Sequence, residues 1–279
     1  MRRSPKILLL IFLLTLFYIL FKYRYVPVEQ FAEETCEEEP DTLIGTWHIP
    51  PSAPPEEEML REFSDVEYGG YYSPKTCSAR HRLAIIVPYK NRPSQLPLFL
   101  YVMHSILRKQ QTEYAIYIVE PADGEVFNRA KLLNIGFLEA SKDRPWECFV
   151  LHDVDLYPEN PRHIYQCADQ PLHLIGGMNK YKYGLPYADY LGGALAITGE
   201  QFWMVNGYSN SFWGWGAEDD EFLCRMKIKG LEMKRASKYL ARYEMFKHPD
   251  KGDKANPVNP HWEKEPRSDK VHMHAIEIS

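Results

Sequence analysis

The sequence has no concentrated basic patch, no Cys-X-X-Cys spacing and no Asn-X-Ser/Thr sequon. Its net charge is −5, and no basic stripe is present that displaces counterions from phosphates, so nucleic acid is not an expected partner. The missing Cys-X-X-Cys spacing argues against zinc. In an oxidising compartment four of the five cysteines can pair, although spacing alone allows several connectivities.

The N-terminus contains one apolar run, from Ile7 to Phe21, broken only by Thr15 and flanked by basic residues. As a helix it rises about 22 Å, which suits a thin bilayer with snorkelling Lys and Arg side chains. We interpret residues 1–6 as a cytoplasmic tail and 7–21 as an uncleaved signal anchor. A cleaved signal peptide is the alternative, but bulky residues follow the run instead of a small-residue cleavage site.

Residues 22–75 lack sustained periodicity and carry two Pro-Pro pairs and several acidic clusters. Such a composition buries little apolar surface, which predicts a stem between the membrane and a lumenal catalytic domain at 76–279. Trp47 and the Leu43-Ile44 pair are the stem residues expected to dock on that domain.

The segment from Leu83 to His152 predicts an α/β fold. Apolar strands are expected at 83–87, 115–119 and 148–152, with helices across 96–109 and 127–137. Alternating strands and helices indicate successive βαβ units, as in nucleotide-binding folds. In the second helix the expected inward residues are Leu132, Leu133, Ile135, Gly136 and Phe137.

Asp153-Val154-Asp155 directly follows the third predicted strand, at the strand end where open α/β sheets bind ligands. Two carboxylates there suit Mg²⁺ or Mn²⁺ together with substrate phosphates. A solvated acidic turn is the simpler alternative. An aspartyl phosphatase is another, but that class places its motif on the first strand with a hydroxyl residue soon after, whereas Tyr157-Pro158 follows here.

The second half contains two glycines at 192 and 193 and the run Trp213-Gly-Trp215-Gly-Ala, followed by four acids at 218–221. Glycines supply hinges, a tryptophan can stack on a sugar, and acids favour a helix start, so we predict a mobile lid next to a helix. A helix cap with buried aromatics is the alternative. Further on, His248 is a candidate metal ligand.

Taken together, these motifs resemble those of the β-1,4-galactosyltransferase family. The resemblance covers roughly residues 36–260 and includes Ile86–Arg92, Phe127–Lys131, Asp153–Asp155, Tyr190–Gly193, Phe212–Asp220 and Met245–His248. It implies a GT-A fold with a Rossmann-like N-terminal half and a mixed central sheet. It also implies Mn²⁺-dependent, inverting transfer of galactose from UDP-galactose to the 4-OH of a terminal GlcNAc on a glycan.

The resemblance also implies a role for each matching position. Asp219 is the expected general base and Glu218 holds sugar hydroxyls. The other implied groups are the metal ligands Asp155, Met245 and His248; the donor-binding residues Pro88, Tyr89, Lys90, Arg92, Phe127, Arg129, Asp153, Val154, Gly193 and Trp215; and the acceptor-binding residues Tyr190, Ala217, Glu218, Asp219 and Asp220.

Two further features follow from the resemblance. The family's disulfides correspond to Cys36 with Cys77 and to Cys148 with Cys167. Cys224 belongs to neither pair. Tyr190 stands where a bulky tyrosine favours galactose and a smaller residue admits N-acetylgalactosamine. A UDP-GalNAc-using enzyme is therefore the alternative for the donor.

The sequence departs from the family pattern in three places. Lys90 replaces a common arginine and Ala217 a frequent glycine. After His248 no counterpart is found for the arginine and aromatic residues that shape the family's N-acetyl pocket, so a catalytically silent sugar-binding relative remains an alternative. The expected location is the Golgi membrane, as a single-pass type II protein with its catalytic domain in the lumen.

Overall fold

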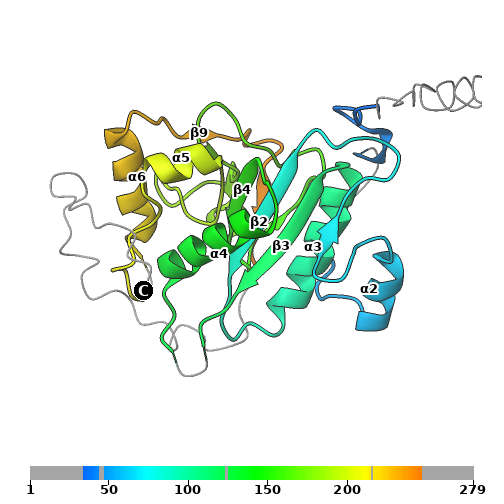
Figure 1. Cartoon of the computed structure of the whole chain (residues 1–279). Helices are drawn as coiled ribbons and strands as arrows, with labels where there is room; N and C mark the ends of the chain where they lie inside the picture. The colour runs from blue at the N-terminus through cyan, green and yellow to red at the C-terminus, as the bar shows by residue number, and fades with distance from the viewer. Residues whose placement is uncertain (1–33, 44–46, 123–124, 215, 247–279) are drawn as a thin grey trace, which may run out of the picture. The chain divides into compact units, whose positions relative to one another are not determined.

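The computed structural model describes residues 34–43, 47–122, 125–214 and 216–246. From Thr35 onward the described residues belong to one compact unit (Figure 1). The predicted anchor lies outside the described residues. Among the residues that are described, no helix has the length and apolar character needed to cross a membrane.

A mixed seven-stranded sheet forms the centre of this unit, in the order β1-β3-β2-β4-β8-β6-β9. Its strands are β1 (Tyr71–Tyr72), β2 (Arg82–Pro88), β3 (Glu113–Val119), β4 (Cys148–His152), β6 (Leu172–His173), β8 (Ala194–Ile197) and β9 (Lys234–Arg235). Strand β2 pairs in parallel with both β3 and β4, whereas β8 runs antiparallel to β4. The predicted α/β fold with a mixed sheet is confirmed.

A second sheet contains β5 (Tyr157–Pro158), β7 (Gly177–Met178) and β10 (Arg242–Glu244). Strand β10 lies between the other two, antiparallel to β5 and parallel to β7. The helices are η1 (Asp41–Leu43), α2 (Glu56–Glu62), α3 (Gln95–Lys109), α4 (Arg129–Asp143), η2 (Asn179–Tyr181), α5 (Gly199–Met204) and α6 (Glu218–Ile228).

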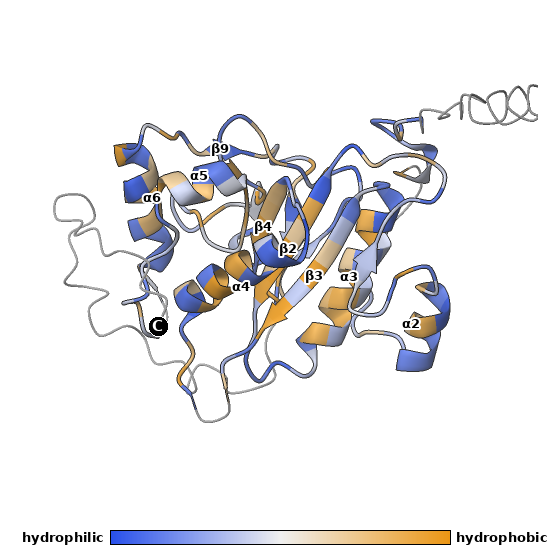
Figure 2. Cartoon of the chain, viewed as in Figure 1, coloured by the Kyte–Doolittle hydropathy of each residue, from blue (hydrophilic) through white to orange (hydrophobic). Residues whose placement is uncertain are grey.

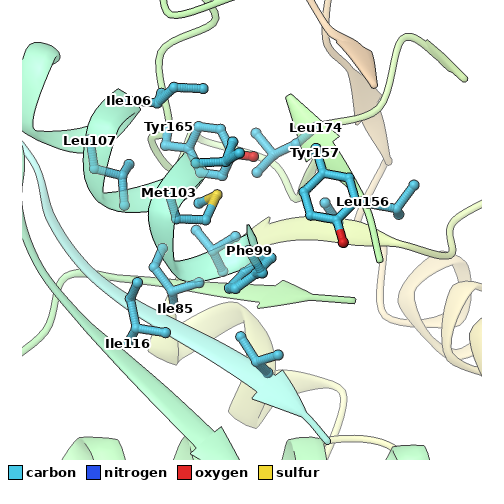
Figure 3. Packing of buried hydrophobic residues seen from close by; sticks show 14 of the residues in the cluster. Ile85, Phe99, Met103, Ile106, Leu107, Ile116, Leu156, Tyr157, Tyr165 and Leu174 are labelled. Carbon is cyan, nitrogen blue, oxygen red and sulfur yellow. The ribbon is translucent and has the colours of Figure 1, made fainter. Parts of the chain in front are cut away.

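The central strands are buried on both faces, as expected for parallel strands covered by helices. Alternate residues of β2 belong to two different core clusters, one with Phe99 and Met103 of α3 and the other with Phe137 of α4. Figure 3 shows the first cluster, where α3 residues meet Ile85 and Ile116 of the strands. Figure 2 shows apolar residues along these strands and mostly polar residues on α6.

Two expectations need correction. Ile135 was predicted to face inward, but its side chain is 38% exposed, because the buried face of α4 follows Leu133, Phe137 and Ala140. Residues 35–75 were assigned to a stem on composition, yet β1 pairs with β3 of the central sheet and Phe63 is buried. The compact unit therefore begins near Thr35 and not at 76.

Disulfides join Cys36 to Cys77 and Cys148 to Cys167, as predicted, and Cys224 takes part in neither. The first bond ties the segment before η1 to the loop that precedes β2. The second ties the start of β4 to the segment before β6, so both staples hold chain that flanks the central strands.

Candidate functional site

The candidate site lies where β4 ends. Because β2 and β4 are parallel, Tyr89 after β2 and Asp153 after β4 follow strands that end at the same edge of the sheet. The backbone N–H of Asp153 donates to the carbonyl of Gly193, 2.7 Å away. The segment before β8 therefore fixes the position of the strand-end carboxylate.

Arg129, the first residue of α4, is the centre of a cluster of carboxylates. Its Nε lies 2.7 Å from Asp153 Oδ1, and its Nη1 lies 2.9 Å from Asp219 Oδ1 and 3.5 Å from Glu218 Oε1. The Arg129 side chain is only 12% exposed. One guanidinium thus joins the acid after β4 to the acids that begin α6, and we call Arg129, Asp153, Glu218 and Asp219 the Arg129 cluster.

One carboxylate oxygen of Asp219 accepts hydrogen bonds, and the other is closely packed against its neighbours. The buried hydroxyl of Tyr208 donates to Oδ1 at 3.1 Å, beside the bond from Arg129. A Cβ placed on Gly192 would come within 2.8 Å of both Asp219 Oδ2 and the Tyr190 hydroxyl. Gly192 therefore leaves the space in which Asp219 and Tyr190 approach each other.

Burial and crowding of like charges shift the protonation of the cluster. Burial raises the pKa of Glu218 to about 7, helped by the negative charge of Asp219 and opposed by Arg129. Burial also raises the pKa of Asp153 to about 6, against the lowering effect of Arg129. The pKa of Tyr190 is raised well above its usual value by burial and by the nearby carboxylates, so its hydroxyl stays protonated.

A Glu218→Gln variant should gain stability over the wild type as the pH rises from 5 to 8. The folded protein favours protonated Glu218, so this group's contribution is complete below its unfolded pKa, about 4.3, and is lost as the pH rises through about 7. Glutamine never ionises and keeps its contribution throughout. Urea unfolding at pH 5, 6, 7 and 8 measures the difference.

The matched control is Glu139→Gln, which removes an exposed carboxylate on α4. Its difference from the wild type should stay nearly constant over the same pH range, because an exposed side chain feels little desolvation. A Glu218→Gln difference that is equally constant would contradict the raised pKa.

Three described residues of the predicted lid segment have backbone φ angles in the left-handed region. Gly214, Gly216 and Ala217 have φ values of 86°, 105° and 74°. Trp215 itself lies outside the described residues. Ala217 is the residue before the first turn of α6 and provides no side-chain cap. An alanine in this conformation is strained, since its Cβ crowds the following carbonyl.

We expect Ala217→Gly to raise the free energy of unfolding by about 1 kcal/mol, because glycine adopts positive φ without the Cβ clash. Ala140→Gly in the buried interior of α4 is the matched control, and there the same exchange should destabilise the protein by about 1 kcal/mol or more. Urea unfolding of both variants checks the opposite signs.

The residues predicted to bind the donor lie near this edge of the sheet but differ in their hydrogen bonds and burial. The Tyr89 hydroxyl accepts from the backbone N–H of Arg92 at 3.2 Å, and Lys90 donates to the carbonyl of Glu125. Phe127 is half-buried just before α4. Pro88 and Val154 are buried, the latter as part of the core around α3, so the Val154 side chain has a packing role.

Two of the three predicted metal ligands lie at the same end of one strand pair. In the antiparallel pair of β5 and β10, Glu244 is opposite Tyr157. Asp155 lies shortly before Tyr157 and Met245 lies directly after Glu244, so both are at the same end of this strand pair. Both side chains are half-buried, and the ring of Phe246 packs 5.5 Å from that of Tyr157. His248 lies outside the described residues, within which no cluster of three acidic, His or Cys ligands occurs.

On the predicted acceptor side, aromatic residues adjoin the acids of α6. The Tyr187 hydroxyl donates to Asp220 Oδ1 at 2.8 Å, and its ring packs edge-on against Tyr190 with centroids 5.5 Å apart. Gly193 has φ 97°, and a Cβ there would lie 2.5 Å from side-chain atoms of Leu156 and Ile175. This glycine position therefore serves packing as well as backbone conformation.

Sequence reasoning missed three residues that hold the site. The side chain of Asn134 bonds both the N–H and the carbonyl of Tyr208, and Asn128 caps α4 while donating to the carbonyl of Asn210. Tyr208 in turn reaches Asp219. Asn128 carried a detectable signal as an N-cap residue before α4, whereas Asn134 and Tyr208 looked like ordinary helix and turn residues.

Sequence comparisons agree on one family. The model for the N-terminal region of glycosyl transferase group 7 matches residues 36–168, and the one described as the N-terminal domain of galactosyltransferase matches 172–249. The Chinese hamster (Cricetulus griseus) β-1,4-galactosyltransferase 3 is 43% identical over 228 residues, which cover 81% of this chain and 57% of that protein. The human β-1,4-galactosyltransferase 1 is 41% identical, with 81% and 56% coverage. The chain thus spans about half the length of these relatives.

Solved structures show the same relationship. The catalytic domain of Drosophila β-1,4-galactosyltransferase 7 in complex with xylobiose is 32% identical with a TM-score of 0.55, covering 64% of this chain and 75% of that one. A mutant of the same enzyme with manganese, UDP-Gal and xylobiose has a TM-score of 0.54 and 29% identity, with 64% and 81% coverage. With both family models matched in order and the GT-A fold shared, the chain belongs to the β-1,4-galactosyltransferase family of glycosyl transferase group 7.

Proposed function

We propose that this chain transfers galactose from UDP-galactose to the 4-OH of a terminal GlcNAc, with inversion and with Mn²⁺. The observation that carries the proposal is the Arg129 cluster, in which one buried guanidinium holds a strand-end acid next to the acids that open α6. Further support comes from the relatives, which are named as galactosyltransferases, one of them solved with manganese and UDP-Gal.

The described part of the proposed metal site fits a divalent cation. Asp155 contributes a hard carboxylate oxygen, and Met245, at the same end of the β5–β10 pair, contributes a softer thioether. Asp153 is bonded to Arg129, and the family resemblance assigns Asp155 to the metal. When bound, Mn²⁺ supplies positive charge that stabilises the departing diphosphate.

The chain's own residues account for the remaining chemistry. Asp219 takes the proton of the acceptor hydroxyl as that oxygen attacks the anomeric carbon, because Arg129 and Tyr208 both bond Oδ1 while Oδ2 lies on the side of Gly192 and Tyr190. Glu218, with its pKa raised to about 7, can donate a hydrogen bond to a sugar hydroxyl when protonated and accept one from it when ionised. The Trp213–Gly216 lid excludes water that otherwise hydrolyses the donor.

The donor is proposed to be galactose and not N-acetylgalactosamine. Tyr190 is half-buried beside the Arg129 cluster, and its bulk fills the space next to Gly192. We further propose residence in the Golgi membrane as a type II protein. This rests on the apolar run at 7–21, and the two disulfides suit an oxidising lumen.

The test is a transfer assay with Mn²⁺, either UDP-galactose or UDP-N-acetylgalactosamine, and acceptors that end in GlcNAc, Glc or Xyl. We expect galactose transfer to GlcNAc, with loss of activity in Asp155→Ala. Sugar binding without turnover by the wild type would favour a catalytically silent relative. Equal turnover by Asp155→Ala would contradict the metal assignment.

A further inference from the structure

A small cavity lies at the opposite end of the β5–β10 pair from the proposed metal ligands. It measures about 290 Å³ and is lined by Trp47, Glu159, Asn160, Tyr239, Leu240 and Arg242. The backbone N–H of Glu159 donates to the carbonyl of Arg242 at 2.9 Å, which closes the strand pair at this end. Met245 lies three residues from Arg242, about 10 Å along a strand, so the two sites are distinct.

The apolar part of this cavity is open to solvent. Tyr239 is 70% and Leu240 38% exposed, and Trp47 is half-buried. Two aromatic side chains from distant parts of the sequence thus line one small cavity together with polar groups. Clefts of this kind suit ligands that have both an apolar face and hydrogen-bonding groups.

The polar groups are positioned before any ligand arrives. Glu159 accepts a hydrogen bond of 2.9 Å from the hydroxyl of Tyr183, and the Arg242 guanidinium lies 5.0 Å from the centroid of the Tyr183 ring. Outside the lining residues, the ammonium groups of Lys109 and Lys238 lie 5.1 Å and 5.2 Å from the centroids of the Trp47 and Tyr239 rings. Glu159 and Arg242 offset each other in charge within the cavity, and the two lysines beside its rings add hydrogen-bond donors at its margin, which suits a ligand rich in hydroxyl oxygens.

We propose that this cavity binds a pyranose residue of a glycan, as a carbohydrate site separate from the Arg129 cluster. A pyranose has an apolar C–H face that packs on Tyr239 or Trp47 and a rim of hydroxyls that bond Glu159, Asn160 and Arg242. The choice of a glycan as ligand rests on the proposed function, but binding here needs no transfer. When an extended glycan binds at this cavity, the effective concentration of its terminal sugar at the Arg129 cluster rises.

The test is ¹⁹F NMR of the full chain labelled with 5-fluorotryptophan, with the Trp47 resonance identified by its absence in Trp47→Phe. Chitotetraose, cellotetraose, xylotetraose and mannotetraose are titrated separately, without donor or metal. At least one should shift the Trp47 resonance in a saturable manner. The tetrasaccharide that does so distinguishes acceptor-type glycans from other polysaccharides.

In Tyr239→Ala, Kd from the Trp47 resonance should rise about tenfold, since a stacking ring is lost. The control is Tyr68→Ala, which removes another highly exposed tyrosine from outside the cavity and should leave Kd unchanged. No saturable shift with any of the four saccharides, or an unchanged Kd in Tyr239→Ala, would overturn the proposal. A protein inactive in transfer that still shows the shift would fail only the proposed function.

Discussion

Asp219→Asn is expected to lower the rate of galactose transfer by a factor of about 10² to 10⁴, the usual contribution of a positioned general base. Asparagine retains an oxygen that can accept from Arg129 and Tyr208, so the geometry around Oδ1 should survive. What it lacks is the ability to take the proton of the attacking hydroxyl. The loss should therefore fall on kcat, which steady-state kinetics with UDP-galactose and a GlcNAc acceptor measures.

Binding controls separate this effect from damage to the site. Titration of Asp219→Asn with UDP-galactose in the presence of Mn²⁺ should give a Kd within about threefold of the wild type, because the proposed metal ligands lie elsewhere. Asp143→Asn, at the end of α4, removes an exposed acid bonded to Tyr117 and should leave kcat unchanged. An Asp219→Asn enzyme that keeps most of its kcat would remove Asp219 from the base role.

The regular part of the fold could be predicted because its pattern is local. The apolar runs of β2, β3 and β4, the helix α3 and the start of α4 were placed within a few residues of where the structure has them, whereas α4 continues to Asp143, beyond its predicted end at 137. Ile135 was misplaced because an apolar residue was assumed to face inward, whereas it lies off the buried face that runs through Leu133, Phe137 and Ala140. Strand β1 was missed because two residues carry no periodicity and are held only by pairing with β3.

The site could be predicted as a set of residues but not as an arrangement. The family resemblance assigned Arg129 to donor binding, and in the structure its guanidinium bonds two acids that are 24 and 90 positions away. Such pairs depend on how β4 and α6 are brought to one edge of the sheet. Tyr208 shows the same limit, because nothing near it in the sequence indicates that its hydroxyl reaches Asp219.

Arg129→Met is expected to cost about 3–5 kcal/mol of stability and to abolish transfer. Methionine replaces the aliphatic part of the side chain but leaves the acids of the Arg129 cluster buried without a cation, and removing one partner from a buried ion pair has costs of this size. Arg129→Lys keeps the charge. However, one ammonium group cannot reproduce the guanidinium fork between Asp153 and Asp219, so an intermediate loss is expected.

The stability of Arg129→Met relative to the wild type should depend on pH with a defined sign. Without Arg129 the buried acids have pKa values raised above their unfolded values, so the stability from their protonated forms is present at low pH and is lost as the pH rises. The deficit should therefore grow between pH 5 and pH 8 in urea unfolding.

Arg108→Met is the matched control, since Arg108 also bonds an acid, Asp65, at 2.8 Å, but at a more exposed position, 25% for the arginine side chain. That variant should lose about 1 kcal/mol or less, with little change over this pH range. Equal losses in the two variants would mean that the acids around Arg129 are not buried as a unit, and the proposed placement of Asp219 would fail with them.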